Sequence, residues 1–217
     1  LYMVDGLDTD NIYSLFIDSQ GINLFASTDA QPGVYMLDIQ DSNELGDHSW
    51  ESLDIFARDS VVSDVVVSNN DPDVIYTVAF PGGVFKSEDR GDSWHEKTGA
   101  LVFEEMFSNG VGFEDSFYKL EMNPTDSNML LLGSYAGDIY VTYDGGDSWE
   151  EFERGLVRNG AVFDFKFSSD GSIVYVSQKA GGVSKMELKN AGEATPDFIE
   201  EEKPSFLNKL RNRFRRN

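Results

Sequence analysis

Hydrophobic and polar residues alternate along most of the first 190 positions, and this period of two is typical of half-buried β-strands. Each alternating stretch is followed by a short turn rich in Asp, Asn, Pro or Gly, and then by a second apolar stretch. The first strands are predicted at Ile12–Ile17, Ser63–Ser68, Phe117–Met122 and Val162–Ser168. The second strands are predicted within residues 22–28, 74–80, 129–135 and 172–178.

The same unit therefore occurs four times. A glycine leads a third strand in each unit, and these glycines are 50, 54 and 45 residues apart, at Gly33, Gly83, Gly137 and Gly182. A repeat of this length built from short strands is typical of a β-propeller. We therefore predict an all-β fold in residues 1–190, with four antiparallel blades of four strands each.

The number of blades in the complete ring stays open. Residues 1–7 align with the outermost strand of a blade, whereas the fourth unit, which ends near Leu188, has no clear outermost strand. One interpretation is that residues 1–7 complete the fourth blade and close a four-bladed ring. The other, favoured by the start at Leu1, is that the chain is part of a larger ring.

Two eight-residue segments follow the third strands of the second and third units. They share a hydroxyl residue, an Asp, a Gly, a Ser and a Trp at the same spacing: Ser87, Asp89, Gly91, Ser93 and Trp94 in one, and Thr142, Asp144, Gly146, Ser148 and Trp149 in the other. The carboxylate can accept hydrogen bonds from the turn, the glycine permits a positive φ, and the Trp can anchor the hairpin. The pattern predicts a locally stapled turn before each outermost strand.

These segments resemble the Asp-box, or bacterial neuraminidase repeat, whose pattern is Ser/Thr-x-Asp-x-Gly-x-Ser/Thr-Trp. The first unit has a stretched version that ends at Trp50, with Glu44 in place of the Asp, and the fourth unit has none. The resemblance implies a propeller in which the box has a structural role. It covers hydrolases as well as non-catalytic propellers such as the sortilin ectodomain and the photosystem II stability factor, so it implies no single chemistry.

The charge is strongly negative, because 39 acidic residues face 17 basic ones, which gives −22. Residues 203–217 hold six of the bases and no acid, so residues 1–202 carry −28. Such a body is expected to repel nucleic acids and anionic membranes. The sequence has no cysteine and no apolar run long enough to span a bilayer.

The sequence offers little for catalysis. In sialidases, the resemblance implies an arginine cluster, but the only arginines before the tail are Arg58, Arg90, Arg154 and Arg158, so we expect no sialidase activity. In xyloglucan-degrading hydrolases, the resemblance implies a pair of Asp residues. Asp64 and Asp164 are the nominees, since first strands line the channel of a propeller. The alternative is that both are solvated carboxylates of the channel wall.

No metal or cofactor site is predicted. His48 and His95 flank tryptophans of the turns and lack the spacing of metal ligands. Residues 41–46 imitate the start of a Ca²⁺ loop, but Leu45 replaces an oxygen ligand and Ser52 stands where a bidentate Glu is needed.

The connection between the second and third units is longer than the others and rich in large apolar side chains. The candidates for partner contacts within it are Phe103, Met106, Phe107 and Phe113. Side chains of this kind must be buried, either across a blade edge or on a partner protein, and both interpretations stay open.

The C-terminal tail differs from the rest of the chain. Residues 191–203 are predicted to form an acidic linker, and residues 204–217 a short basic amphipathic helix. The candidate contact residues of this helix are Phe206, Leu207, Leu210, Arg211, Arg213, Phe214 and Arg215. Three interpretations stay open: a solvated end, a docking peptide for a protein groove, or a membrane-surface anchor.

We therefore predict a non-catalytic propeller that binds protein or glycan as a scaffold or assembly subunit, with the tail as its docking element. One alternative is part of a secreted glycoside hydrolase, and another is a component of a surface adhesin. The resemblance implies a location outside the cytoplasm, whether periplasmic, on the cell surface or secreted.

Overall fold

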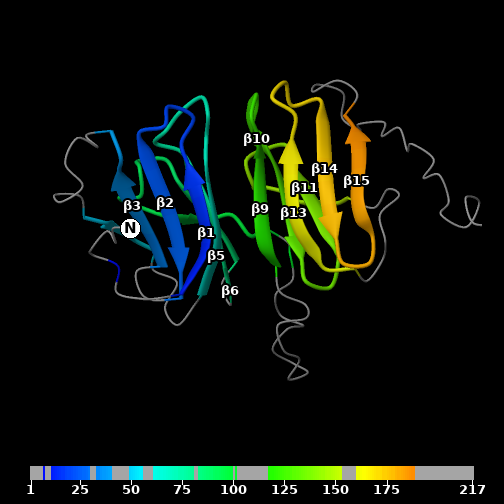
Figure 1. Cartoon of the computed structure of the whole chain (residues 1–217), viewed down its shortest axis with the longest axis horizontal. Coiled ribbons are helices and arrows are strands. Elements are labelled where there is room, and N and C mark those ends of the chain that lie inside the picture. Colours follow the sequence, from blue (N-terminus) through cyan, green and yellow to red (C-terminus); the bar gives the residue numbers. More distant parts are fainter. Residues whose placement is uncertain are drawn as a thin grey trace, which may run out of the picture.

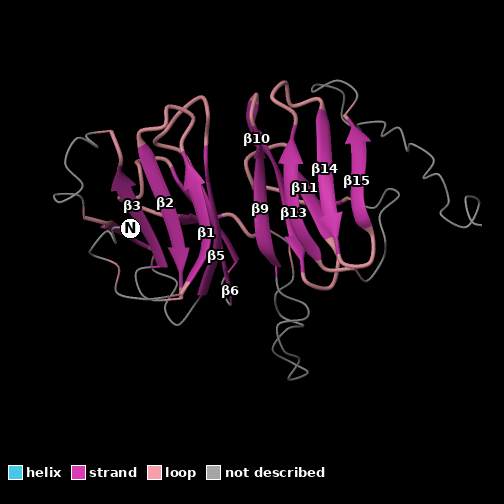
Figure 2. Cartoon of the chain, in the orientation of Figure 1, coloured by secondary structure: helices cyan, strands magenta, loops and turns pink. Residues whose placement is uncertain are grey.

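The computed structural model describes residues 7, 11–29, 33–40, 49–55, 61–80, 83–99, 101, 117–152 and 160–188. Within these residues every regular element is a β-strand (Figure 2). The strands form four separate antiparallel sheets, which are the blades. Within the same residues, no helix has the length and hydropathy needed to cross a lipid bilayer.

Each blade is a meander in which consecutive strands are neighbours. Blade 1 contains β1 (Ile12–Ile17), β2 (Asn23–Thr28), β3 (Gly33–Asp38) and β4 (Glu51–Asp54). Blade 2 contains β5 (Val61–Val67), β6 (Ile75–Phe80), β7 (Gly83–Ser87) and β8 (His95–Glu96). Blade 3 contains β9 (Phe117–Asn123), β10 (Asp126–Ser134), β11 (Ile139–Thr142) and β12 (Glu150–Glu151). Blade 4 contains β13 (Val162–Phe167), β14 (Ile173–Gln178) and β15 (Gly182–Glu187).

The prediction of an all-β propeller with four blades is confirmed. In the third blade, Phe117 begins β9, as predicted, and is buried. Its ring lies edge-on to that of Tyr140, with centroids 5.4 Å apart. The fourth blade has three strands in the described residues, and residues 1–6 lie outside them.

The blades are arranged as an open arc. The first strand of each blade lies innermost, with β1 beside β5, β5 beside β9 and β9 beside β13. Among the described strands, no contact of similar extent joins β13 back to β1. The end blades spread away from these inner strands, so that β3 and β15 lie at opposite sides of the molecule (Figure 1).

The hydrophobic core lies between the blades. The alternation of apolar residues gives each sheet two apolar faces, and each face packs on the next sheet. Three clusters result: Phe25, Val34 and Val65 lie between blades 1 and 2, Val78 and Leu132 between blades 2 and 3, and further buried residues between blades 3 and 4. Sequential stacking of blades therefore buries surface that a single blade leaves exposed.

Blade 1 exposes apolar positions that other blades bury. Counted along the inner strands, Leu15 and Ile17 of β1 correspond to Val65 and Val67 of β5. Val65 and Val67 are buried against blade 1, whereas Leu15 is 61% and Ile17 56% exposed. The face of blade 1 that points away from blade 2 thus has the apolar composition of a face that packs on another blade, which we call a blade-packing face.

Candidate functional site

All four inner strands contain a bulge at the same position. In the pairing of each first strand with its second strand, one residue near the start of the first strand has no partner: Tyr13, Ser63, Tyr118 and Phe163. A bulge bends the strand and redirects the side chains beside it. The residues that follow the bulges, Ser14, Asp64, Lys119 and Asp164, therefore occupy equivalent positions on adjacent strands.

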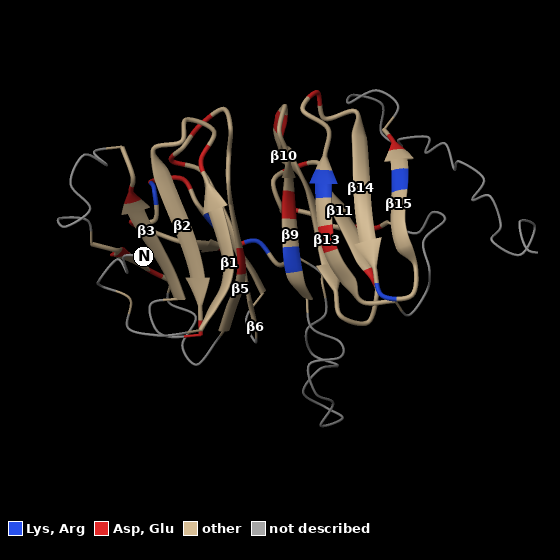
Figure 3. Ribbon diagram, viewed as in Figure 1, with Lys and Arg blue, Asp and Glu red and all other residues tan. Residues whose placement is uncertain are grey.

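Lys119 joins the two carboxylates nominated from the sequence. Its Nζ lies 3.1 Å from Asp64 Oδ2 and 3.5 Å from Asp164 Oδ1. Burial lowers the pKa of Lys119, but the charges of Asp64 and then Asp164 outweigh it, so the pKa is raised above its usual value. Both signs of charge on β9 and β13 are visible in Figure 3.

Asp64 is a structural carboxylate. It is 2% exposed, and its Oδ2 accepts a hydrogen bond of 2.9 Å from the N–H of Leu120 on the next blade. Its Oδ1 accepts another, of 3.1 Å, from the N–H of Val65. The expectation of a solvated channel-wall carboxylate is therefore wrong for Asp64. In this structure the carboxylate is covered and paired with Lys119, so it supports the packing of blade 3 on blade 2 rather than facing solvent.

Asp164 differs from Asp64 in exposure. Its side chain is 44% exposed, which agrees with the interpretation as a channel-wall group in contact with solvent. Next to it, burial and the charges of Tyr135 and Asp164 raise the pKa of Tyr118 to about 12. The rings of Tyr118 and Tyr135 lie 6.0 Å apart between centroids, and Phe163, which precedes Asp164 on β13, is 53% exposed.

A pocket of about 200 Å³ lies at the other end of the inner strands. All four inner strands or the turns after them contribute to it, with Phe16, Val67, Glu121 and Phe167 among its walls. Burial raises the pKa of Glu121, although Lys166, 2.9 Å away, opposes this shift. The Glu121–Lys166 pair also ties blade 3 to blade 4.

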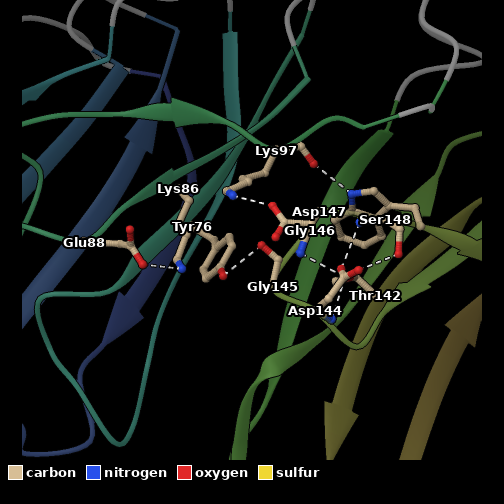
Figure 4. Close-up of polar contacts among 11 residues, drawn as sticks. Tyr76, Lys86, Glu88, Lys97, Thr142, Asp144, Gly145, Gly146, Asp147 and Ser148 are labelled. Atoms are coloured by element: carbon tan, nitrogen blue, oxygen red, sulfur yellow. Dashed lines mark hydrogen bonds and ion pairs between the residues drawn. The ribbon is translucent and has the colours of Figure 1, made fainter. Parts of the chain in front are cut away.

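The two segments ending in Trp94 and Trp149 form nearly identical turns, which we call the Trp turns (Ser87–Trp94 and Thr142–Trp149). In the second, Asp144 accepts hydrogen bonds from Thr142 Oγ1 (2.7 Å), the N–H of Ser148 (2.9 Å) and Ser148 Oγ (2.6 Å) (Figure 4). The first has the same set of bonds within 0.1 Å, made by Asp89, Ser87 and Ser93. Gly91 and Gly146 have φ of 99° and 90°, as expected.

The Trp turns are not only local, which corrects the sequence-based interpretation. Trp149 Nε1 donates a hydrogen bond of 2.8 Å to the carbonyl of Lys97 on the preceding blade. The hydroxyl of Tyr76 in blade 2 donates to the carbonyl of Gly145, and Lys97 forms an ion pair with Asp147 (Figure 4). A Cβ on Gly146 would lie 2.9 Å from Lys97 Cβ. The turns therefore also join neighbouring blades.

Several predicted site residues fall outside the described residues. These are the four apolar residues of the long connection (Phe103, Met106, Phe107 and Phe113), all candidates in the tail, His48, and the Ca²⁺-like segment at 41–46. Trp50 is described and half-buried, and His95 lies on β8 rather than in a turn. In the described part of the chain, no group of three acidic or histidine side chains could hold a metal ion.

Sequence reasoning missed Lys119, Tyr118 and Tyr135. The signal for Lys119 was a basic residue within an apolar inner strand, at the same place in the repeat as Asp64 and Asp164. The bulges gave no such signal, because they depend on the pairing with the second strand.

Comparisons with known proteins support the fold. No family model matches the chain. A curated relative, the oligoxyloglucan-reducing end-specific xyloglucanase of Emericella nidulans, is 27% identical over 151 residues, which are 69% of this chain and 16% of the relative.

Three solved structures are similar across most of the chain. The GH74 enzyme of Niastella koreensis has a TM-score of 0.62 at 18% identity, over 89% of this chain and 30% of that one. The Cps50 (Swd1) β-propeller domain of Myceliophteria thermophila has a TM-score of 0.64 at 13% identity, over 91% and 59%. YCF48 bound to D1 peptide has a TM-score of 0.57 at 15% identity, over 82% and 51%. These likenesses establish a β-propeller, and this chain spans at most 59% of the length of these structures.

Proposed function

We propose that this chain is a non-catalytic propeller module that binds a protein partner, as a scaffold or assembly subunit of a larger complex. The observation that carries the proposal is the position of Lys119 between Asp64 and Asp164. Two carboxylates serve as acid and base in glycoside hydrolysis only if both can reach the substrate. Here one is buried and a lysine holds both. Two exposed aromatic residues, Tyr135 and Phe163, lie near the start of the same inner strands, and exposed aromatics are typical of binding surfaces.

One of the similar propellers supports a protein partner, because YCF48 was solved bound to D1 peptide. We further propose that the Trp turns are Asp-boxes, that residues 204–217 are the docking element, and that the module works outside the cytoplasm.

The test is purification of the full chain from its source beside a variant with Arg211, Arg213 and Arg215 each changed to Gln. We expect a stoichiometric partner, identified by mass spectrometry, that accompanies the intact chain and is lost from the variant. A chain that carries no partner at matched salt would contradict the scaffold function. A partner that accompanies both forms would contradict only the role of the tail.

A second candidate function is hydrolysis of a xyloglucan-like glycan, which the similarity to the xyloglucanase favours. It is tested by release of reducing ends from xyloglucan by the full chain and by Asp164→Asn. We expect no release from either form. Release that Asp164→Asn abolishes would replace the scaffold proposal by an enzymatic one.

A further inference from the structure

Three aromatic residues and one partly exposed carboxylate lie near the start of the neighbouring strands β9 and β13. Tyr118 and Phe163 occupy the bulges of these two strands, and Tyr135 follows β10 with its ring 6.0 Å from that of Tyr118. Tyr135 is 42% and Phe163 53% exposed. We call Tyr118, Tyr135, Phe163 and Asp164 the aromatic–carboxylate site.

The covered polar atoms of this site differ in their pairing. Among the described residues, Tyr118 Oη has no hydrogen-bond partner, whereas Asp164 Oδ1 is covered but forms an ion pair with Lys119, whose Nζ lies 3.5 Å away. Buried polar atoms without a partner are uncommon, because they lose hydration without compensation. The rest of the Asp164 side chain is open to solvent, since the side chain as a whole is 44% exposed, and a carboxylate only accepts hydrogen bonds, so a ligand that donates them suits the site.

The charge of the site favours a cation over a neutral donor. Asp64, Lys119 and Asp164 together carry −1, and this charge lies within a body of −28. The faces of aromatic rings attract cations, and a negatively charged body raises the local concentration of basic segments. A neutral sugar could stack on the same rings but would leave the negative charge uncompensated.

We propose that the aromatic–carboxylate site binds a Lys or Arg side chain from a basic segment of the partner protein. The inference rests on the proposed function, since it names the chemistry by which that partner is recognised. The cationic group pairs with Asp164 while its alkyl stem lies on the rings of Phe163 and Tyr135. Lys119 stays with Asp64 and holds Asp164 in place.

The test uses the full chain and a defined probe, the peptide acetyl-Gly-Ala-Arg-Ala-Gly-amide. The matched control peptide replaces Arg by citrulline, which keeps the shape and removes the charge. Binding is measured by calorimetric titration at low and physiological salt. We expect the Arg peptide to bind about tenfold more tightly than the citrulline peptide, because one charge-assisted hydrogen bond typically makes a difference of this size.

Two protein variants locate the binding. Asp164→Asn should weaken binding of the Arg peptide about tenfold. Asp54→Asn removes the same charge from an exposed position on β4, the outermost strand of blade 1, and should leave the affinity unchanged. Thermal unfolding of both variants checks that the fold is retained.

Two further variants test the contribution of the aromatic rings and of a nearby positive charge. Phe163→Ala removes an exposed ring and should weaken binding several-fold. Lys179 lies in the turn after β14, where its N–H bonds to the carbonyl of Ala161 before β13. This bond places Lys179 near the start of β13. Lys179→Gln removes a positive charge that repels the Arg peptide, so it should strengthen binding.

Three outcomes would overturn the inference. Equal weakening by Asp164→Asn and Asp54→Asn would mean general attraction to an acidic surface. Tighter binding of a xyloglucan oligosaccharide than of the Arg peptide, lost in Asp164→Asn, would make the site a sugar site. Absence of binding to either peptide would exclude a cation site. None of these results decides whether a protein partner accompanies the chain during purification, so failure here and failure of the scaffold function are distinguishable.

Discussion

At the residue scale, equivalent residues in different blades make different contacts. Trp94 and Trp149 end the same eight-residue pattern, and both pack against interblade cores. Yet only Trp149 donates its Nε1–H to a described acceptor, the carbonyl of Lys97, whereas Trp94 Nε1 is buried without a partner among the described residues. The motif fixes the turn, and the neighbouring blade decides whether the indole is bound.

This difference predicts unequal costs for two identical substitutions. Trp149→Phe removes a hydrogen bond and leaves a carbonyl unpaired, so it should lower the free energy of unfolding by about 1 kcal/mol more than Trp94→Phe does. Denaturant unfolding of both variants measures the difference. Equal losses would show that the bond to Lys97 contributes nothing.

Hydrogen-bonded carboxylates predict a loss of stability in acid. Hydrogen bonds from Ser93 hold the pKa of Asp89 below its usual value, and those from Ser168 and Ser172 lower that of Asp170 to about 2. In Asp144, burial raises the pKa but the bonds from Ser148 and Thr142 outweigh it and lower it.

Because these folded carboxylates release protons more readily than unfolded ones, whose pKa is about 3.9, their contribution is present above about pH 4 and lost as the pH falls toward about 2. The melting temperature should fall as the pH is lowered through this range, and Asp144→Asn should make the fall of the melting temperature with pH less steep. Glu121, whose pKa burial raises, acts in the opposite sense, because its protonation favours the folded state. An unchanged slope in Asp144→Asn would contradict this assignment.

At the element scale, the inner strands are joined by charges as well as by apolar contacts. Asp64 on β5 binds Lys119 and the backbone of β9, and Lys119 reaches Asp164 on β13. One cation therefore connects three blades. A covered ion pair of this kind costs stability when only one member is removed, because the other stays buried without its full compensation.

We therefore expect Asp64→Ala to lower the free energy of unfolding by about 3 kcal/mol, the lower end for a broken buried pair, since Lys119 keeps Asp164. Asp164→Ala removes a half-exposed partner and should cost at most about 1 kcal/mol. Chemical unfolding of the two variants gives the comparison. A larger cost for Asp164→Ala would place the supporting contact on β13 instead of β5.

At the scale of the whole molecule, both ends of the arc present blade-packing faces. Tyr175 and Val183 of blade 4 correspond by register to Tyr76 and Val84 of blade 2. The residues of blade 2 are buried, while Tyr175 is 41% and Val183 68% exposed. Blade 1 shows the same contrast through Leu15 and Ile17. Each end thus has the surface chemistry to receive another sheet.

The matched pair Leu15→Asp and Val65→Asp tests this view at one register position. Val65→Asp places an unpaired charge between blades 1 and 2, and we expect it to cost on the order of 3–5 kcal/mol or to prevent folding. Leu15→Asp should change stability by about 0.5 kcal/mol or less, because Leu15 is exposed. Thermal unfolding and light scattering compare them. Similar destabilisation by both would mean that another sheet covers blade 1.

The fold was largely predictable from the sequence because a propeller repeats a local pattern. The predicted first strand at Ile12–Ile17 coincides with β1, and the strand-leading Gly33 and Gly83 begin β3 and β7. Alternation and turn residues act over a few positions, so they can be read without knowledge of the rest of the chain. The site was less predictable: Asp64 and Asp164 were named, but as a catalytic pair or solvated groups.

The sequence by itself determined the strands, their division into four blades and the two Trp turns, because each depends on residues close together in the chain. The tertiary structure alone decided that Lys119 binds two carboxylates, that Tyr118 meets Tyr135, and that Trp149 reaches Lys97. The interblade contacts join residues about 50 positions apart, and their partners depend on how blades stack and where strands bulge. Local periodicity carries no information on either, so burial and charge at the site follow only from the assembled blades.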